Sequence, residues 1–363
     1  MSVRALTHEQ VAGWRIARHR LVERAPREAL AAVASEICGA QAQVMSSAEL
    51  ALWTRVEDVS PADVQEALWE RRSLVKTWAM RGALHLLAAD DWPVFAGAGR
   101  TRDHFRKPSW LRGFQITAPQ LEQLLADVAG ALGDEPLTKV ELAETVGGAL
   151  GERLLSGWGD HLKLVAYQGA LCFGPNRGRN VTFVRPSAWL GAQPELDPRD
   201  ALAELARRYL RAYGPASHED FAVWWHMASG AARKLFASLD LTEVAVEGES
   251  RWALTEDVDA IAECELDDRV RLLGGFDVLT IAWRPRERFI PDGFLPRVSR
   301  TAGWISPIVL ARGRVAGMWE PKRRGKRVEV RIEPFVRVNR RTVEAEARGL
   351  ADFYGAPVDV VWA

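Results

Sequence analysis

Cysteine is scarce in this 363-residue chain, which contains only Cys38, Cys172 and Cys264. An odd and scattered set of three argues against a disulfide framework, and no two of them have the spacing of a zinc site. No run of 18 or more apolar residues is present, and residues 1–8 lack the apolar core of a signal peptide. We therefore expect a protein of the reducing cytoplasm that does not enter a membrane.

Several familiar catalytic motifs are also missing. The sequence has no Gly-x-x-x-x-Gly-Lys-Ser/Thr phosphate loop, no Rossmann glycine fingerprint, no His-Glu-x-x-His and no Gly-x-Ser-x-Gly nucleophile elbow. The seven histidines are dispersed along the chain. These absences predict that the protein uses neither a metal ion nor an organic cofactor. Residue chemistry alone indicates no evident catalytic constellation.

Charge is balanced overall but unevenly distributed. The 48 basic side chains equal the 48 acidic ones, which by itself speaks against nucleic acid as a ligand. Residues 321–341, however, contain nine lysines and arginines against two glutamates, and residues 100–112 contain five against one aspartate. Compensating acidic residues gather in 256–268. Separated patches of this kind fit a protein with one face for a polyanion, and they fit ordinary solvated faces equally well.

A unit of three helices followed by a two-stranded hairpin recurs along the chain and is clearest in its middle. Residues 119–132 have the pattern of an amphipathic helix. Thr138 and Glu141 then form a capping box that predicts a second helix, and a third is expected over 160–170. Two strands flanking a basic turn at 174–180 complete the unit.

The same order follows on the C-terminal side. A helix over 199–213 precedes a capping box of Ser217 and Asp220, and a third helix is expected over 230–238. Strands are expected at 243–246 and 252–254. The turn between them is acidic, so this copy is a poor candidate for contact with phosphate.

A first copy is expected within residues 1–90, where Thr7 and Gln10 cap the opening helix. From about Leu266 onward, short β-rich segments predominate, with a helix near 342–353, which fits a small barrel or a curled sheet. The predicted fold class is therefore α+β, with three tandem winged-helix units followed by a C-terminal β-barrel. Tandem winged helices are mostly nucleic-acid modules or protein-docking relatives of them.

Two segments of the first copy resemble the AlkZ-like family of bacterial DNA glycosylases. They are residues 37–56, ICGAQAQVMSSAELALWTRV, and residues 76–85, KTWAMRGALH. Later landmarks occur in the same order, namely LGGFD at 273–277, GWISP at 303–307 and GRVAGMW at 313–319. The resemblance covers most of the chain. It implies a C-shaped molecule in four segments, three winged-helix units at 1–118, 119–197 and 198–262 and a β-barrel at 263–363.

The resemblance also implies a catalytic pair. In the family, the signature of glutamine, apolar residue and glutamine falls on Gln41-Ala42-Gln43 of this chain. A sibling branch has aspartate in the second position and acts on a broader set of adducts and crosslinks. Gln43 therefore favours the branch that repairs N7-alkylguanine lesions left by bulky natural products. Where the family often has Arg-Gly-Thr-x-His, Ala83 replaces the threonine, so any role of that hydroxyl is absent here.

Two glutamines suit the chemistry of such a lesion. Alkylation at N7 makes the purine a good leaving group, so hydrolysis needs a positioned water and a negative dipole near the developing oxocarbenium ion. A carboxamide oxygen supplies both, and a neutral amide repels a nearby phosphate less than a carboxylate would. No lysine lies near the pair in sequence, which argues against a lyase step through a Schiff base.

Further residues are candidates for contact with DNA. Arg81 and His85 are candidates for a phosphate or abasic-site contact, with a turn-stabilising role as the alternative. The other candidates are the basic residues of two turns, Arg177, Arg179, Lys322, Arg323, Arg324, Lys326 and Arg327.

We therefore expect a monofunctional DNA glycosylase that acts on bulky N7-alkylguanine adducts or interstrand crosslinks, in repair or in self-resistance to a genotoxic natural product. Its expected partner is double-stranded DNA carrying alkylated guanine, and we expect a monomer with no obligate protein partner. One alternative is a non-enzymatic regulator built from tandem winged helices, although such regulators usually dimerise and no dimerisation helix is obvious. The other is the broader-range glycosylase branch, which Gln43 disfavours.

Overall fold

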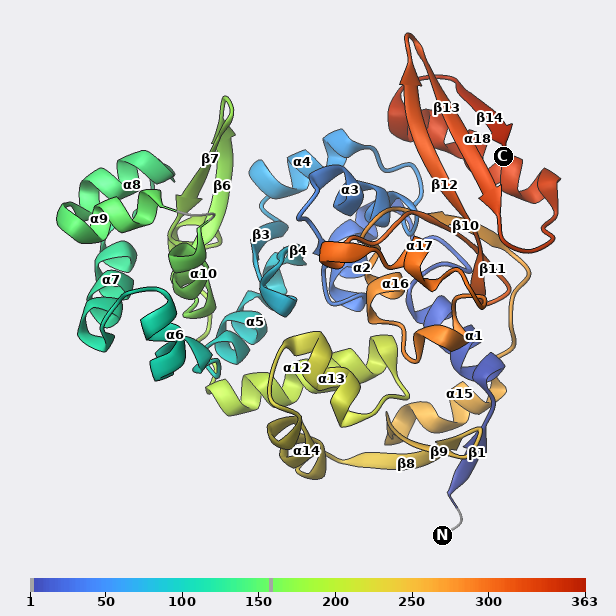
Figure 1. The fold of residues 1–363 in the computed structure, drawn as a ribbon, viewed down its shortest axis with the longest axis horizontal. Coiled ribbons are helices and arrows are strands. Elements are labelled where there is room, and N and C mark those ends of the chain that lie inside the picture. Colours follow the sequence, from blue (N-terminus) through green and yellow to red (C-terminus); the bar gives the residue numbers. More distant parts are fainter. Residues whose placement is uncertain (1–2, 157–158) are drawn as a thin grey trace. The chain divides into compact units, whose positions relative to one another are not determined.

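The structure is a computed structural model that describes residues 3–156 and 159–363, and Figure 1 shows it as a ribbon. The predicted α+β class is confirmed, because helices and small sheets alternate along the chain. Contacts divide the chain into two compact units. The discontinuous unit combines Met1–Val64 with Arg207–Ala363, and the continuous unit is Gln65–Ala206. No helix in the described ranges is both long enough and apolar enough to cross a membrane.

The discontinuous unit begins with short helices. Its first elements are β1 (Arg4–Leu6), α1 (His8–Arg18), η1 (Arg27–Ala29), α2 (Leu30–Glu36), β2 (Ala40–Gln41), α3 (Met45–Trp53) and the start of α4 (Pro61–Trp69). The predicted capping box at the start of α1 is confirmed: the Gln10 amide donates to the Thr7 hydroxyl at 3.1 Å, and the Thr7 amide donates to the Gln10 side chain at 2.8 Å. Strand β1 pairs in parallel with β8 (Leu241–Val246), so the first described residues complete a sheet made by a much later part of the chain.

The middle of the discontinuous unit follows the predicted order of helices and strands. After the end of α12 (Pro198–Tyr213) come α13 (His218–Trp225), α14 (Ser229–Ala237), β8, β9 (Glu249–Leu254) and α15 (Val258–Glu263). The capping box of Ser217 and Asp220 opens α13 as predicted. The contact between α12 and α13 is aromatic: the ring of Tyr209 packs against the rings of Phe221 and Trp224, with centroids 5.2 and 5.0 Å apart.

The C-terminal part is a five-stranded sheet covered by a helix. Its strands are β10 (Val270–Leu273), β11 (Ile308–Ala311), β12 (Arg314–Arg324), β13 (Arg327–Pro334) and β14 (Val358–Trp362), in this spatial order. Between them lie α16 (Val278–Ala282), α17 (Leu295–Val298), η7 (Thr301–Gly303) and α18 (Arg340–Tyr354). All neighbouring strands are antiparallel except β13 and β14, which are parallel.

The predicted closed barrel is wrong for the residues that the structure describes, where the sheet is open with β10 and β14 at its edges. Helix α18 packs its apolar side, including Val343, Ala347 and Leu350, onto the sheet beside Val330. It also carries the chain across the sheet, so β14 joins β13 in parallel on the outer side. The last strand therefore extends the sheet outward and does not close it onto β10.

The continuous unit contains the middle copy of the predicted repeat. Its strands are β3 (Leu74–Trp78), β4 (Leu84–Ala88), β5 (Leu137–Thr138), β6 (Cys172–Arg177) and β7 (Asn180–Val184). Its helices include α5 (Trp92–Gly99), α6 (Pro108–Gly113), α7 (Ala118–Ala131), α8 (Lys139–Val146), α9 (Gly148–Leu155), α10 (Asp160–Tyr167) and α11 (Pro186–Trp189).

The local signals of the middle copy were read correctly for α7, α8 and α10, whereas α5, α6, α9 and α11 were not predicted. Helix α7 buries Leu121, Leu124 and Val128 at helical spacing, and the capping box of Thr138 and Glu141 opens α8. Helix α9 begins directly after α8, where Gly147 and Gly148 both have positive φ angles of 69° and 53°. The two glycines, which look like the end of a helical region, here redirect the chain into a further turn of helix.

A fully buried ion pair joins α3 to α16 in the discontinuous unit. The Arg55 guanidinium donates to both oxygens of Asp277 at 2.8 and 2.9 Å, and neither side chain is exposed. Arg55 also donates to the Ala51 carbonyl, while Asp277 accepts from the Leu279 amide at the start of α16. The bidentate geometry and these extra hydrogen bonds compensate for the removal of both charges from water.

We predict that Asp277→Ala destabilises the protein by about 3–5 kcal/mol, because it leaves the Arg55 charge buried without a counter-charge. Thermal and urea unfolding of the full-length protein measure the effect. The matched control is Asp359→Ala, which breaks an ion pair with Arg327 between side chains that are about half exposed, and it should destabilise the protein far less because solvent screens that pair. Equal effects of the two variants would contradict the assigned role.

Candidate active site

Helix α2 ends in a left-handed turn that directs the Gln-Ala-Gln segment. Cys38 and Gly39 have positive φ angles of 57° and 91°. The Gly39 amide donates to the Ala34 carbonyl at 2.7 Å, and the Cys38 amide donates to the Ser35 carbonyl at 2.9 Å, which is the Schellman arrangement of a helix C-terminus. The chain then leaves the helix abruptly and becomes extended in β2.

The Gln-Ala-Gln segment is buried as far as Ala42 and emerges at Gln43. Ala40 and Ala42 expose 0 and 1 % of their surface, Gln41 exposes 8 %, and Gln43 is exposed. Strand β2 ends at Gln41, and Gln43 lies in a bend just before α3. The small, buried alanines let the backbone lie against the core on either side of Gln41.

The core holds the segment on both sides of the glutamine pair. Before the pair, the buried Tyr213 hydroxyl donates to the Ile37 carbonyl at 2.8 Å. After it, Val44 precedes α3 and packs against a small apolar cluster of Phe276, Ile281 and Ile305. The segment therefore has little freedom to change its direction, which is what a site needs in order to position a reacting water.

These supporting residues were not identified from the sequence. Tyr213 and Ile281 carry no motif, and Phe276 and Ile305 were noticed only as parts of the LGGFD and GWISP landmarks. A conspicuous glycine or tryptophan pattern can mark such a region, but it does not reveal which element the region packs against.

The β3–β4 hairpin of the continuous unit contains two other candidate residues, Arg81 in the turn and His85 in β4. Arg81 and Gly82 have positive φ angles of 54° and 69°, and a side chain at Gly82 would come within 2.9 Å of the Tyr167 hydroxyl. His85 exposes 0 % of its surface, and its Nδ1 atom lies 3.0 Å from the Ala83 carbonyl. The buried ring offers no surface to DNA in this structure, which disfavours the predicted contact at His85. The turn-stabilising alternative for His85 and a DNA contact at Arg81 stay predictions.

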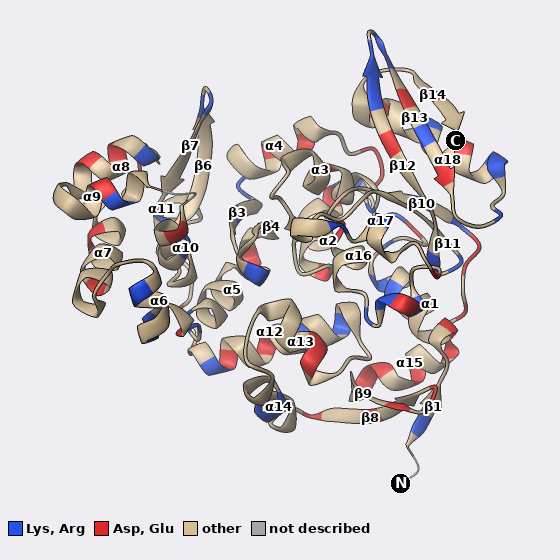
Figure 2. Cartoon of the chain, in the orientation of Figure 1, with Lys and Arg blue, Asp and Glu red and all other residues tan. Residues whose placement is uncertain are grey.

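The β6–β7 hairpin has a shorter tip than predicted. Strand β6 extends to Arg177, which leaves Gly178 and Arg179 as the turn. The Arg177 guanidinium donates to the Glu141 carboxylate and to the Pro136 carbonyl. A backbone hydrogen bond from Thr138, together with this guanidinium, lowers the pKa of Glu141 to about 2. Arg177 thus fastens the hairpin to the start of α8, while Arg179 is exposed at the tip (Figure 2).

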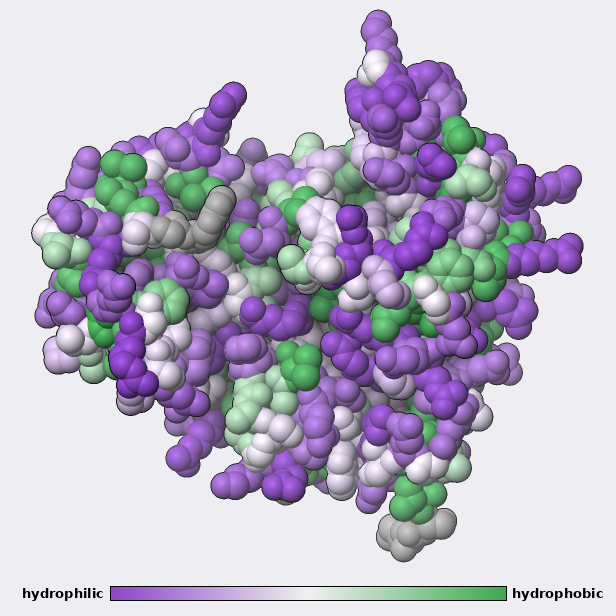
Figure 3. Space-filling model, in the orientation of Figure 1, coloured by the Kyte–Doolittle hydropathy of each residue, from purple (hydrophilic) through white to green (hydrophobic). Residues whose placement is uncertain are grey.

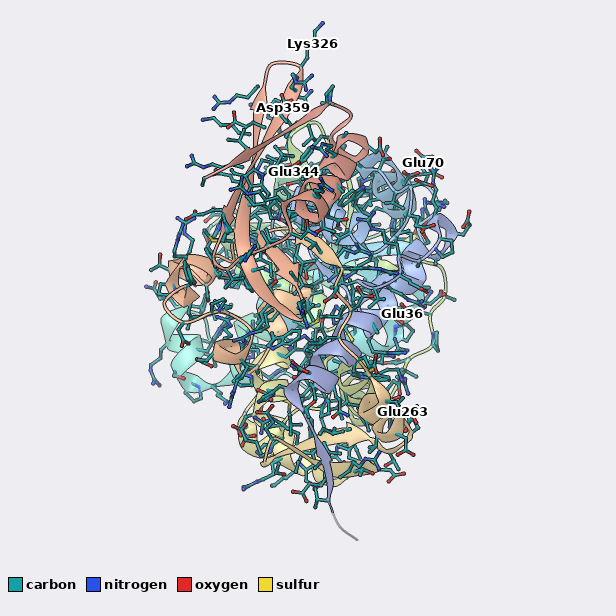
Figure 4. All side chains as sticks on the ribbon, turned by 90° about the vertical axis from the view of Figure 1, so that its right-hand side faces the viewer. Glu36, Glu70, Glu263, Lys326, Glu344 and Asp359 are labelled. Carbon is teal, nitrogen blue, oxygen red and sulfur yellow. The ribbon has the colours of Figure 1, made fainter. Side chains whose placement is uncertain are left out.

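The β12–β13 hairpin of the discontinuous unit carries the largest group of candidate residues. Residues 321–327 are all exposed, and the hairpin projects from its sheet as a hydrophilic arm (Figures 2 and 3). Arg324 is paired with Glu329, Arg327 is paired with Asp359, and Arg323 donates to backbone carbonyls. Lys322 and Lys326 have no hydrogen-bond or ion-pair partner in the described part of the chain, and Lys326 projects from the tip (Figure 4).

We predict that His85 makes stability depend on pH. Burial, followed by the charge of Arg81, lowers the pKa of His85 from 6.5 to about 3 in the folded protein. Between pH 6.5 and about 3 the unfolded chain binds a proton at His85 and the folded protein does not. The stability of the folded protein with neutral His85 is therefore fully present above pH 6.5 and decreases as the pH falls toward 3. His85→Asn should therefore flatten the decrease in Tm between pH 7 and 5. His8→Asn, at a partly exposed position, is the control, and an identical pH profile for wild type and His85→Asn would refute the prediction.

Comparisons with known proteins cover nearly the whole chain. A family model described as DNA glycosylase AlkZ-like matches residues 34–353, a range that includes the glutamine pair and every landmark. The chain is 37% identical over 374 residues to a Streptomyces sahachiroi protein named interstrand DNA cross-link repair glycosylase, which covers 97% of this chain and 98% of that protein.

A solved structure supports the same relationship. The Streptomyces sahachiroi DNA glycosylase AlkZ matches the fold with a TM-score of 0.89 and 36% sequence identity, over 98% of this chain and 100% of that one. Similarity at this level over the full length establishes common descent as well as a common fold. The chain therefore belongs to the AlkZ-like family of DNA glycosylases, and it is itself a DNA glycosylase.

Proposed function

We propose that this DNA glycosylase hydrolyses the N-glycosidic bond of bulky N7-alkylguanine adducts or of interstrand crosslinks, and that Gln41 and Gln43 are its catalytic residues. The observation that carries the proposal is the geometry of the Gln-Ala-Gln segment. Gln41 and Gln43 flank the buried Ala42 in a short segment that follows the left-handed turn after α2 and precedes Val44, which packs against the apolar cluster.

The reaction needs little acid catalysis because the lesion is already activated. Water adds its oxygen to C1′ of the sugar, the bond from C1′ to N9 breaks, and its electron pair passes into the purine and cancels the positive charge at N7. The water releases one proton to solvent. The products are the free alkylated base and an abasic site.

The two amides stabilise the charge that develops in this step. A carboxamide oxygen accepts a hydrogen bond from the attacking water and directs its negative end at the oxocarbenium-like sugar. Such fixed dipoles are most effective when they need not reorganise, which fits a segment held by the core on both sides. Because an amide is a very weak base, the same pair is poorly suited to removing undamaged bases, which are worse leaving groups.

Binding to the duplex is proposed to involve winged-helix units in the predicted segments 1–118, 119–197 and 198–262. Support comes from the order of helices followed by a hairpin in the middle and third copies and from the basic tip of the β6–β7 hairpin. The basic tip of the β12–β13 hairpin, in the C-terminal sheet, is proposed as a further contact. Arg179, Lys322 and Lys326 are the best-placed candidates for phosphate contacts, because their side chains are exposed and form no ion pair in the described part of the chain.

The biological setting is also a proposal. The Streptomyces sahachiroi relative is named for interstrand DNA cross-link repair, and we propose the same class of lesion here, in general repair or in self-resistance to a genotoxic natural product. Action as a cytoplasmic monomer is part of this proposal.

We predict that Gln41→Ala and Gln43→Ala each lower base release by about 100-fold or more, since removal of one preorganised dipole from an active site has an effect of this size. Single-turnover release from a duplex carrying one bulky N7-alkylguanine measures it. DNA affinity should be retained in both variants. Gln123→Ala, which removes an exposed glutamine on α7, is the matched control and should behave as the native protein does. Normal release by either active-site variant would refute its catalytic role.

We predict that replacing both Lys322 and Lys326 by alanine weakens binding to undamaged duplex DNA. It should also reduce the slope of log affinity against log salt concentration by about 2, since each phosphate contact contributes about 0.9 to that slope. Fluorescence anisotropy over a salt series measures both quantities. Arg348→Ala, an exposed arginine on α18 that pairs with Glu344, should leave the slope unchanged. An unchanged slope in the double variant would exclude the hairpin tip from the DNA interface.

A further inference from the structure

An exposed tryptophan lies close to the Gln-Ala-Gln segment. Trp304 exposes 46 % of its surface, and among the phenylalanines, tyrosines and tryptophans of residues 3–156 and 159–363 it alone falls in the exposed class. Indole rings carry a large apolar area, and the protein buries or half-buries the others that the structure describes. An exposed tryptophan that packs next to the proposed catalytic segment is therefore a candidate for contact with a ligand.

The loop that carries Trp304 is built to hold the ring in place. The Arg300 amide donates to the Trp304 carbonyl at 2.8 Å, and Ser299 and Ile305 form an antiparallel bridge. Between them, Ala302 and Gly303 adopt positive φ angles of 57° and 74°. A left-handed alanine is unfavourable and persists only where the surrounding structure fixes it, so the loop is a defined turn.

A short chain of contacts connects this ring to the glutamine pair. The Trp304 ring packs edge-to-face on Phe276, with centroids 4.8 Å apart. Phe276 belongs to the cluster with Ile281 and Ile305 against which Val44 packs, and Val44 directly follows Gln43. The exposed face of the indole and the two carboxamides thus share one rigid support within the discontinuous unit.

The remaining residues of the loop suit an approach by nucleic acid. The exposed run is Arg300, Thr301, Ala302, Gly303 and Trp304. A guanidinium stands at one end and an indole at the other, and the three residues between them are small. This combination matches the two recognisable parts of a nucleotide, an anionic phosphate and a flat aromatic base.

We propose that Trp304 is a substrate-binding residue whose indole stacks on a flat aromatic face of the damaged DNA near the scissile bond. The inference rests on the proposed function for the position of that bond. The flat face can belong to the nucleobase at or beside the lesion, or to the aromatic body of the adduct, and two substrates distinguish these sources. Stacking contributes to binding in the ground state and in the transition state alike, so its loss acts on KM and leaves kcat nearly unchanged.

The kinetic test compares native protein, Trp304→Ala and Trp304→Phe under single-turnover conditions. One duplex carries N7-methylguanine and the other an N7-guanine adduct with a planar polycyclic group. Trp304→Ala should raise the half-saturating enzyme concentration about 10-fold, in line with the loss of one stacked base. The loss affects both substrates if the ring stacks on a nucleobase, and only the polycyclic one if it stacks on the adduct. Trp304→Phe should recover most of the affinity.

The control variant is Val336→Ala, which removes an apolar side chain that is also 46 % exposed in the same unit. It should match the native protein with both substrates. Native kinetics in Trp304→Ala, or a loss of kcat without a change in half-saturation, would overturn the proposal. A lower Tm would show that Trp304→Ala destabilises the protein. In that case Trp304→Phe, which keeps an aromatic ring, is compared with Trp304→Leu, which keeps the bulk without the ring.

A second readout does not depend on catalysis and keeps this inference separate from the proposed function. A duplex containing a stable abasic-site analogue flanked by 2-aminopurine is titrated with each protein. Stacking of the indole should quench the 2-aminopurine emission with native protein and Trp304→Phe but not with Trp304→Ala, at concentrations that saturate binding. Equal quenching by all three would refute the stacking role. Absence of base release by the native protein in the kinetic test would instead refute the proposed chemistry.

Discussion

The buried pair of Arg55 and Asp277 is the interaction on which the candidate active site depends. It joins the end of α3 to the start of α16, two elements that are distant in sequence. Val44, which immediately precedes α3, packs against the apolar cluster that includes Ile281 of α16. A charged pair that is removed from water tolerates few alternative geometries, because each hydrogen bond lost would leave a buried charge uncompensated. Its position therefore makes the direction of α3, and of the glutamines just before it, a fixed property of the fold.

The Gln-Ala-Gln segment proposed as the active site is short, neutral and held on both sides. A left-handed turn with a Schellman pattern directs the chain out of α2. The Tyr213 hydroxyl donates a hydrogen bond to the Ile37 carbonyl at the same helix end. Neutral amides on a rigid support suit a substrate that carries its own activating charge, because the enzyme then needs oriented dipoles more than a strong acid. Basic side chains gather instead at the exposed tip of the β12–β13 hairpin (Figure 2).

Predictions based on neighbouring residues were the most successful. The capping boxes at Thr7, Thr138 and Ser217 all form, because a side chain and a backbone amide three residues apart can bond without help from the rest of the fold. The β-rich character of the C-terminal part and its helix near 342–353 were also predicted, but closure of the sheet into a barrel was not correct. A barrel closes only if the last strand pairs with the first. Here α18 leads to β14, which pairs with the outer side of β13, and no local sequence pattern predicts this pairing.

The sequence by itself determined the family, the catalytic candidates Gln41 and Gln43, and most of the helices, since these depend on residue identity and on short-range spacing. Only the tertiary structure decided what surrounds them. It paired Arg55 with Asp277, placed His85 in the core, engaged Arg177 with Glu141 and left Trp304 exposed. The physical reason is the same in each case. Burial and partner choice depend on atoms brought together from distant parts of the chain, and the properties of a side chain in solution do not reveal which atoms those are.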